Sequence, residues 1–167
     1  MEEAQDTARK IALAAIKYGD LSNQASKDYI FDIERFTSFE GNTGPYILYT
    51  IVRIKSILGK YEATGKSVAD CLGAMEAAHN EHEKDLMLVL SRFNAVVENA
   101  YEESAPHKIC AYIYELANAF NGFYHGTKIL SEENEAVQKA YIGLLNLTKN
   151  VLETCIDMLG FEAPERM

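Results

Sequence analysis

Proline is scarce in this chain, and its spacing limits the folds that the chain can adopt. The three prolines, Pro45, Pro106 and Pro164, are separated by two stretches of more than fifty residues each. Strands and turns usually need more frequent breaks, whereas the interior of a long helix excludes proline. Pro45 and Pro106 both stand where a proline opens the first turn of a helix behind a capping residue. We therefore expect long helices, two of them beginning at these prolines.

Apolar residues recur every three or four positions in several segments, which is the pattern of amphipathic helices. These segments are residues 8–18, 47–58, 85–100, 107–124 and 134–160. Only residues 29–31 read as extended, and they are too few to found a sheet. The sequence predicts an all-α bundle of five to six helices, with residues 1–40 as a less compact lead-in and a short helix inside a mobile connection over residues 61–83. Gly143, inside a predicted helix, should mark close packing.

Composition and charge exclude several classes of protein. The longest apolar runs, such as residues 109–114, have six residues, and a membrane-spanning helix needs about 20. The first ten residues are acidic and polar, unlike a secretion signal. Three widely spaced cysteines do not suggest disulfides, so we expect a reducing, cytoplasmic location. The net charge of −9 argues against a general nucleic-acid coat, but residues 51–66 carry a local excess of three positive charges, which permits a phosphate contact.

Two segments invite a catalytic or ligand-binding interpretation, and both have the wrong spacing. Residues 59–67 place five residues between two glycines, whereas a phosphate-binding loop needs four and should follow a strand. A helix stopped by glycine and followed by a polar linker fits better. His79 and His82 lie three residues apart among carboxylates but lack the spacing of a zinc protease helix. A small metal-dependent enzyme using these two histidines stays a remote alternative.

Aromatic residues combine with basic ones at two places in the sequence. Tyr46, Tyr49 and Arg53 share one helix face, which would set two rings and a guanidinium in a row. Such a row can stack unpaired bases and hold a phosphate. Tyrosines on amphipathic helices also often pack their rings against the core, and spacing alone does not decide between the two. The second aromatic and basic group is formed by Phe120, Phe123, Tyr124 and Lys128.

Long blocks of the sequence, in a fixed order, carry a resemblance to a known family. The blocks are IKYGDLSN at 16–23, KDYIFD at 27–32, FEGNTGPY at 39–46, YELANAFNGFY at 114–124 and LGFEAPERM at 159–167. This arrangement resembles the C-terminal part of the arginyl-tRNA synthetases, over nearly the full chain. The resemblance implies a segment over residues 1–40 that follows the catalytic domain, and an all-helical DALR anticodon-binding domain over residues 41–167.

The resemblance also implies that a different domain of such an enzyme carries the catalytic activity. The HIGH and KMSKS signatures, which bind ATP in class I synthetases, do not occur in this sequence. We therefore expect a fragment that is inactive alone and has no cofactor, while the parent enzyme would use ATP and Mg to attach arginine to tRNA. The expected partners are arginine tRNA and the parent catalytic domain, with no contact to DNA or to a membrane.

Some family residues can be transferred because they match motifs in this sequence. By resemblance, the anticodon-facing residues are Tyr46, Tyr49 and Arg53 in a PYxQYxxxR-like segment, Tyr124 in FNxFY, and the final Met167. Lys128 and Arg166 are expected to contact phosphates. The chain departs from the family pattern at Leu48, where glutamine is frequent, and at Tyr141, where an arginine is usual.

One further interpretation is a helical protein-interaction module that uses the acidic half of the chain. Residues 67–167 carry the whole negative excess, because residues 1–66 contain equal numbers of acidic and basic residues. Binding of an arginine anticodon stem-loop would separate the two interpretations.

Overall fold

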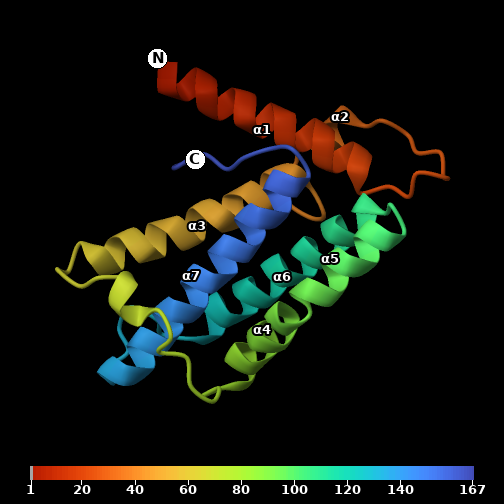
Figure 1. The fold of residues 1–167 in the computed structure, drawn as a ribbon. Coiled ribbons are helices and arrows are strands. Elements are labelled where there is room, and N and C mark those ends of the chain that lie inside the picture. Colours follow the sequence, from red (N-terminus) through yellow and green to blue (C-terminus); the bar gives the residue numbers. More distant parts are fainter. Residues whose placement is uncertain (1) are drawn as a thin grey trace.

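The computed structural model describes residues 2–167, and the elements in that range are helices without a strand (Figure 1). The elements are α1 (Glu2–Leu21), α2 (Ile33–Phe36), α3 (Gly44–Glu62), the 3₁₀ turn η1 (Ala69–Cys71), α4 (Glu81–Ser91), α5 (Phe93–Glu102), α6 (Pro106–Gly126) and α7 (Glu135–Met158). Six of the described α-helices have ten or more residues. The predicted all-α fold is confirmed.

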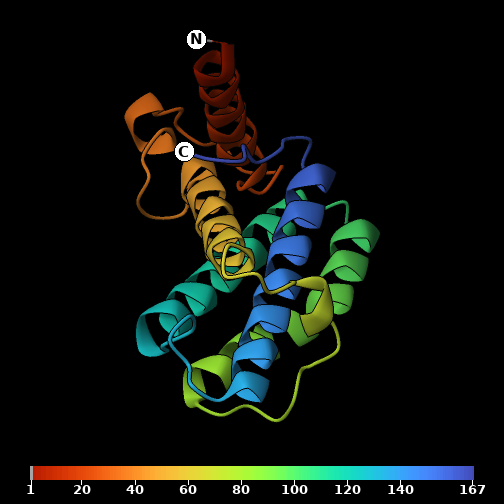
Figure 2. The same cartoon turned by 90° about the vertical axis from the view of Figure 1, so that its left-hand side faces the viewer.

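Helices α3, α6 and α7 pack on one another and form the centre of the bundle. Helix α1 lies against α3, while α4 and α5 lie against α6 on the other side (Figures 1 and 2). The side chains between these helices are almost fully buried, including Ile51 and Ile54 from α3, Ile113 and Phe120 from α6, and Leu152 from α7. This packing fixes the seam between α3 and α6, where the candidate site lies.

The start of α3 is set by local chemistry that the sequence shows directly. The Thr43 hydroxyl accepts a hydrogen bond from the Tyr46 backbone N–H at 3.2 Å, and Pro45 occupies the first turn. Gly44 has a different role, because a Cβ atom at this position would lie 2.2 Å from the carbonyl oxygen of Ala14 in α1. The absence of a side chain at Gly44 therefore lets α1 approach α3 closely.

The single helix predicted over residues 85–100 is wrong, because the structure divides it into α4 and α5. The Arg92 N–H donates to the Val89 carbonyl at 3.2 Å, which tightens the chain by one 3₁₀-type turn. Arg92 keeps right-handed helical angles, φ −87° and ψ −3°. The apolar stripe therefore continues across the break, and both helices can pack on α6.

The other predicted helices are present, and their ends differ from the predicted ranges; α1, for example, spans Glu2–Leu21 instead of residues 8–18. Helix α6 begins at Pro106, but its N-cap residue, Ala105, makes no side-chain capping bond. Helix α3 continues through Gly59 to Glu62 instead of stopping at that glycine. Between residues 61 and 83 the short helix is the 3₁₀ turn η1. A Cβ at Gly143 would lie 2.5 Å from the Cys71 carbonyl oxygen in η1, which confirms close packing at Gly143.

The first helix is part of the packed core. Tyr18 of α1 is fully buried, and its hydroxyl lies within hydrogen-bonding distance of the Asn42 side-chain oxygen and, at 2.9 Å, of the Cys110 carbonyl oxygen. The second half of α1, around residues 14–19, is thus part of the packed core, whereas residues 3–9 are mostly exposed. The predicted domain boundary between residues 40 and 41 stays a prediction.

Candidate nucleic-acid interface

An arginine lies between two tyrosine rings at the seam of α3 and α6. The Arg53 guanidinium carbon is 4.7 Å from the centre of the Tyr49 ring and 5.1 Å from the centre of the Tyr124 ring. The same guanidinium donates to the Tyr49 hydroxyl at 3.0 Å and to the Asn121 side-chain oxygen at 2.9 Å. We call Tyr49, Arg53, Asn121 and Tyr124 the Arg53 cluster. The cation–π contacts and hydrogen bonds of this cluster fix the position of the Arg53 guanidinium.

The helical repeat explains how these side chains meet. Tyr49 and Arg53 are four residues apart on α3, and Asn121 and Tyr124 are three apart on α6, so each pair shares one helix face. Phe120 is fully buried and stacks beneath Tyr124 with ring centres 6.0 Å apart. The two tyrosines remain 41% and 38% exposed, for Tyr49 and Tyr124 respectively. The cluster therefore presents partly open rings beside a fixed positive charge.

Tyr46 lies next to the cluster but faces inward more than its neighbours. Its ring is half-buried and meets Tyr114 edge to face, with ring centres 5.8 Å apart. Its hydroxyl donates to the Asn118 side-chain oxygen and accepts from the Asn121 amide, both at 2.7 Å. Burial raises the pKa of this hydroxyl above its ordinary value. Tyr46 thus holds Asn121, which in turn holds Arg53, and it differs from the open ring that the sequence predicted.

Two asparagines of this network were missed by the sequence analysis. Asn118 and Asn121 precede Tyr124 on α6 at steps of three, so all three residues lie along one face of that helix. That spacing was the available signal, but asparagine on a helix surface usually has no special role. Only the position of α3 beside α6 shows that these amides connect Tyr46 with Arg53.

Met167 lies near the cluster, at one end of an open groove. The groove has a volume of about 510 Å³ and is lined by Thr7, Ile11, Phe39, Glu40, Tyr49 and Met167. It lies between α1, the loop before α3 and the final residues of the chain. Tyr49 therefore belongs both to the Arg53 cluster and to this groove, and it is the residue of the cluster that shares the groove with Met167.

The two predicted phosphate contacts lie outside the Arg53 cluster. Lys128 is exposed in the loop after α6. The exposed Arg166 donates to the Glu3 carboxylate of α1 at 2.7 Å. The structure therefore groups Tyr49, Arg53 and Tyr124, with Tyr46 behind them, and places Met167 in the groove that Tyr49 also lines.

The basic segment over residues 51–66 does not form one positive patch. Lys55 points toward α7 and the chain end, where it pairs with Glu153 at 3.1 Å and with Glu165 at 2.8 Å. Lys66 donates to the Gln138 side-chain oxygen at 2.6 Å and lies over the Tyr61 ring. Among the basic residues of this segment, Arg53 is thus the one that the structure places beside the rings of Tyr49 and Tyr124.

The fold and this site can be compared with known proteins. Residues 47–167 match the family described as the DALR anticodon binding domain. The chain belongs to this family. The predicted family is therefore confirmed, and the matched range contains each residue of the Arg53 cluster.

Relatives of this DALR domain are arginine–tRNA ligases. The chain is 74% identical to the enzyme of Agathobacter rectalis and 57% identical to that of Alkaliphilus oremlandii, over 99% of its own length in both cases. It spans about 28% of the length of these relatives. Among solved structures, Thermus thermophilus arginyl-tRNA synthetase matches with a TM-score of 0.86 at 32% identity, covering 97% of this chain and 27% of that one. The synthetase of Plasmodium falciparum matches with a TM-score of 0.81 at 29% identity, covering 95% and 27%.

The two departures from the family pattern lie inside this DALR domain. Leu48 is fully buried in the core. Tyr141 is also buried, and its ring meets Phe123 edge to face at 5.3 Å and His79 at 5.9 Å between ring centres. Both side chains therefore lie in the interior, and neither belongs to the Arg53 cluster.

The structure also describes the alternative sites. His79 Nδ1 lies 3.2 Å from the Glu83 carboxylate, whereas His82 packs against α6 at Gly126. Within residues 2–167 no group of three or more His, Cys, Asp or Glu side chains could hold a metal ion. No helix in this range is long and apolar enough to cross a membrane. The comparisons do not support a protein-interaction module.

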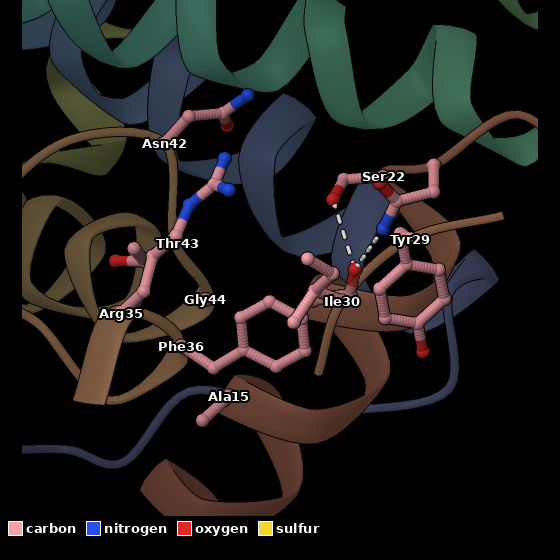
Figure 3. Close-up of a pocket in the computed structure, with 11 residues that line it drawn as sticks. Ala15, Ser22, Tyr29, Ile30, Arg35, Phe36, Asn42, Thr43 and Gly44 are labelled. Atoms are coloured by element: carbon pink, nitrogen blue, oxygen red, sulfur yellow. Dashed lines mark hydrogen bonds between the residues drawn. The ribbon is translucent and has the colours of Figure 1, made fainter. Parts of the chain in front are cut away.

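A separate pocket of about 280 Å³ lies between the end of α1, α2 and the loop before α3. Figure 3 shows Phe36 and Tyr29 on its walls, with Arg35 extending toward Asn42. The Ser22 hydroxyl and the Asn23 amide both donate to the Gly19 carbonyl oxygen, at 3.2 Å and 2.6 Å. No residue of the Arg53 cluster lines this pocket, so the two sites are distinct.

Proposed function

We propose that this DALR domain binds the anticodon loop of arginine tRNA as part of an arginine–tRNA ligase. The Arg53 guanidinium, held between the partly open rings of Tyr49 and Tyr124, is the observation that supports this most directly. In the proposed enzyme a catalytic domain attaches arginine to the tRNA with ATP and Mg, in the cytoplasm. The role of this domain is to hold the anticodon so that the acceptor end reaches that catalytic domain.

The chemistry of the cluster suits unpaired nucleotides. Single-stranded RNA is recognised mainly by bases that splay out and stack on aromatic or guanidinium planes. Stacking of one base on an aromatic side chain contributes about 1–3 kcal/mol. Phosphate contacts add affinity without sequence information. Because the chain carries a net charge of −9, attraction of RNA to the whole surface is weak and local contacts must supply the affinity.

A titration with an arginine anticodon stem-loop at low salt tests the proposal. We expect Tyr49→Ala and Tyr124→Ala each to weaken binding by about 1–3 kcal/mol, because each removes one stacking plane. Tyr101→Ala is the matched control, since Tyr101 is a tyrosine on α5 that is 86% exposed. Circular dichroism of each variant shows whether it is folded. Unchanged affinity in folded Tyr49→Ala and Tyr124→Ala, or equal weakening in the control, would refute base stacking at this site.

The same titration assesses the proposed phosphate contacts. Lys128→Gln and Arg166→Gln should each lower the slope of log affinity against log salt by about 0.7 to 0.9 if the residue binds one phosphate. An unchanged slope removes that residue from the proposed interface and leaves the stacking contacts unaffected.

A further inference from the structure

The last eight residues follow a defined path that ends beside the proposed RNA-binding face. We call residues 160–167 the tail. Gly160 follows the end of α7 with φ +80°, and the tail then runs beside both α1 and α3 (Figure 1). Phe161 and Pro164 are buried along the way. The path brings Met167 into the groove that Tyr49 also lines.

Polar contacts from α1 and α3 hold this tail along its length. Lys17 donates to the Gly160 carbonyl oxygen at 2.6 Å, and Lys10 pairs with Glu162 at 3.2 Å. Nearer the end, Lys55 pairs with Glu165 at 2.8 Å. One residue further on, Arg166 pairs with Glu3 of α1 at 2.7 Å, but both of these side chains are exposed. The Lys55–Glu165 pair is therefore the contact nearest Met167 that involves a largely enclosed side chain.

Lys10 and Lys55 each pair with a tail carboxylate and with a second carboxylate, but Lys10 is 22% exposed and its second partner, Asp6, lies on its own helix. Lys55 is more enclosed and connects the tail to a different helix. Its side chain is only 16% exposed, and its ammonium group lies between the carboxylates of Glu165 and Glu153. Exposed ion pairs contribute little, about 0–1 kcal/mol, because water and salt screen them. The Glu165 side chain of this pair is itself 87% exposed, but the lysine is largely enclosed and is fixed by a second carboxylate from α7, so it gives the tail a defined attachment point. Lys55 is also two residues from Arg53, so one helix carries both the cluster and this attachment.

We propose that Lys55 is a positioning residue that holds Glu165 and thereby places Met167 in the groove that Tyr49 also lines, completing the RNA-binding face. Lys55 itself points away from the Arg53 cluster, toward α7 and the tail, and contacts no base in this arrangement. The inference rests on the proposed function for its effect on RNA. The placement of the tail can be measured without RNA.

The first experiment measures the attachment of the tail alone. Lys55→Met should let carboxypeptidase release Met167 at least threefold faster than from the unmodified chain. Lys60→Met is the matched control, because it removes the same charge from an exposed position on the same helix, and its release rate should not change. Lys55→Arg should restore slow release, since arginine can pair with both carboxylates. An unchanged release rate in Lys55→Met overturns the proposal.

The second experiment uses a charge argument to separate positioning from simple attraction. Glu165→Gln removes a negative charge from an acidic protein, so electrostatic attraction alone would strengthen RNA binding. If Glu165 positions Met167, the same variant should weaken anticodon stem-loop binding about three- to tenfold. This variant leaves the Lys55–Glu153 pair in place, and Glu165 is exposed, so the fold should be retained.

The two possible failures can be told apart. A faster release of Met167 together with unchanged or tighter RNA binding in Glu165→Gln overturns the positioning role. The Tyr49→Ala and Tyr124→Ala titrations decide the proposed function independently of that result. Weaker RNA binding in Lys55→Met but not in Lys60→Met, with rescue by Lys55→Arg, supports positioning over loss of charge.

Discussion

Replacing Gly44 by alanine should destabilise the chain, although alanine is normally the better helix residue. The new Cβ would lie 2.2 Å from the Ala14 carbonyl oxygen and 2.5 Å from its carbonyl carbon. An ordinary contact between carbon and oxygen is more than 3 Å, so α1 must move away from α3 by about 1 Å. The obstacle is backbone and cannot rotate aside. Overpacking of this kind costs about 1–3 kcal/mol, which exceeds the gain of about 0.5–1 kcal/mol from replacing glycine in a helix.

Gly59 provides the matched control within the same helix. A Cβ at Gly59 meets nothing within 4 Å, so Gly59→Ala should stabilise the chain by about 0.5–1 kcal/mol. Urea unfolding followed by circular dichroism at 222 nm would measure both variants. The two should differ in sign, with Gly44→Ala less stable than the unmodified chain. If Gly44→Ala is as stable as Gly59→Ala, the close approach of α1 to α3 is not as described.

Two further predictions concern buried ionisable groups. Glu83 is almost fully buried and accepts a hydrogen bond from the His79 backbone N–H at 2.6 Å, so Glu83→Ala should lower the free energy of unfolding in urea by about 1–3 kcal/mol. The control is Glu81→Ala, in the same turn but exposed, which should cost about 0.5 kcal/mol or less. Equal costs for the two variants would contradict the role of burial. Burial raises the pKa of the Cys110 and Cys155 thiols from 9.0 to about 12. The unfolded chain therefore ionises these thiols first, and the free energy of unfolding should fall as pH rises from about 9 toward 12, by up to about 2.7 kcal/mol per pH unit for the two thiols together. Unfolding curves between pH 8 and 10.5 measure that slope, which should be shallower when both cysteines are alanine.

The sequence predicts best those features that neighbouring residues determine. The start of α3 follows from Thr43 and Pro45, which act within one turn of the helix. The end of α7 follows from Gly160, whose φ of +80° suits glycine. The break at Arg92 could not be predicted in this way, because the apolar stripe continues across it and no proline or glycine marks it.

The candidate site shows the same limit more clearly. Helical spacing grouped Tyr49 with Arg53, and the family resemblance alone added Tyr124; the structure brings these three side chains together. Spacing did not show that Tyr46 turns inward, because that depends on Tyr114 and Asn118 of a helix far along the chain. Contacts of this kind depend on how α3 and α6 pack.

The contacts that hold the tail could not be predicted from the sequence. Lys55 and Glu165 are 110 residues apart, and each is an ordinary surface residue when considered alone. The local positive excess near Lys55 suggested a phosphate contact, whereas in the structure the Lys55 ammonium group pairs with the carboxylates of Glu153 and Glu165. A charge count along the sequence cannot distinguish a lysine that faces a ligand from one that holds another segment.

The enclosure of Arg53 has a consequence for the thermodynamics of binding. A mobile arginine side chain carries about 2 kcal/mol of rotamer entropy, which is lost when a ligand immobilises it. Here two rings and the Tyr49 and Asn121 oxygens already restrict the guanidinium, so folding has removed that freedom beforehand. The positive charge is thus preorganised, and an incoming nucleotide would meet a surface that needs little rearrangement.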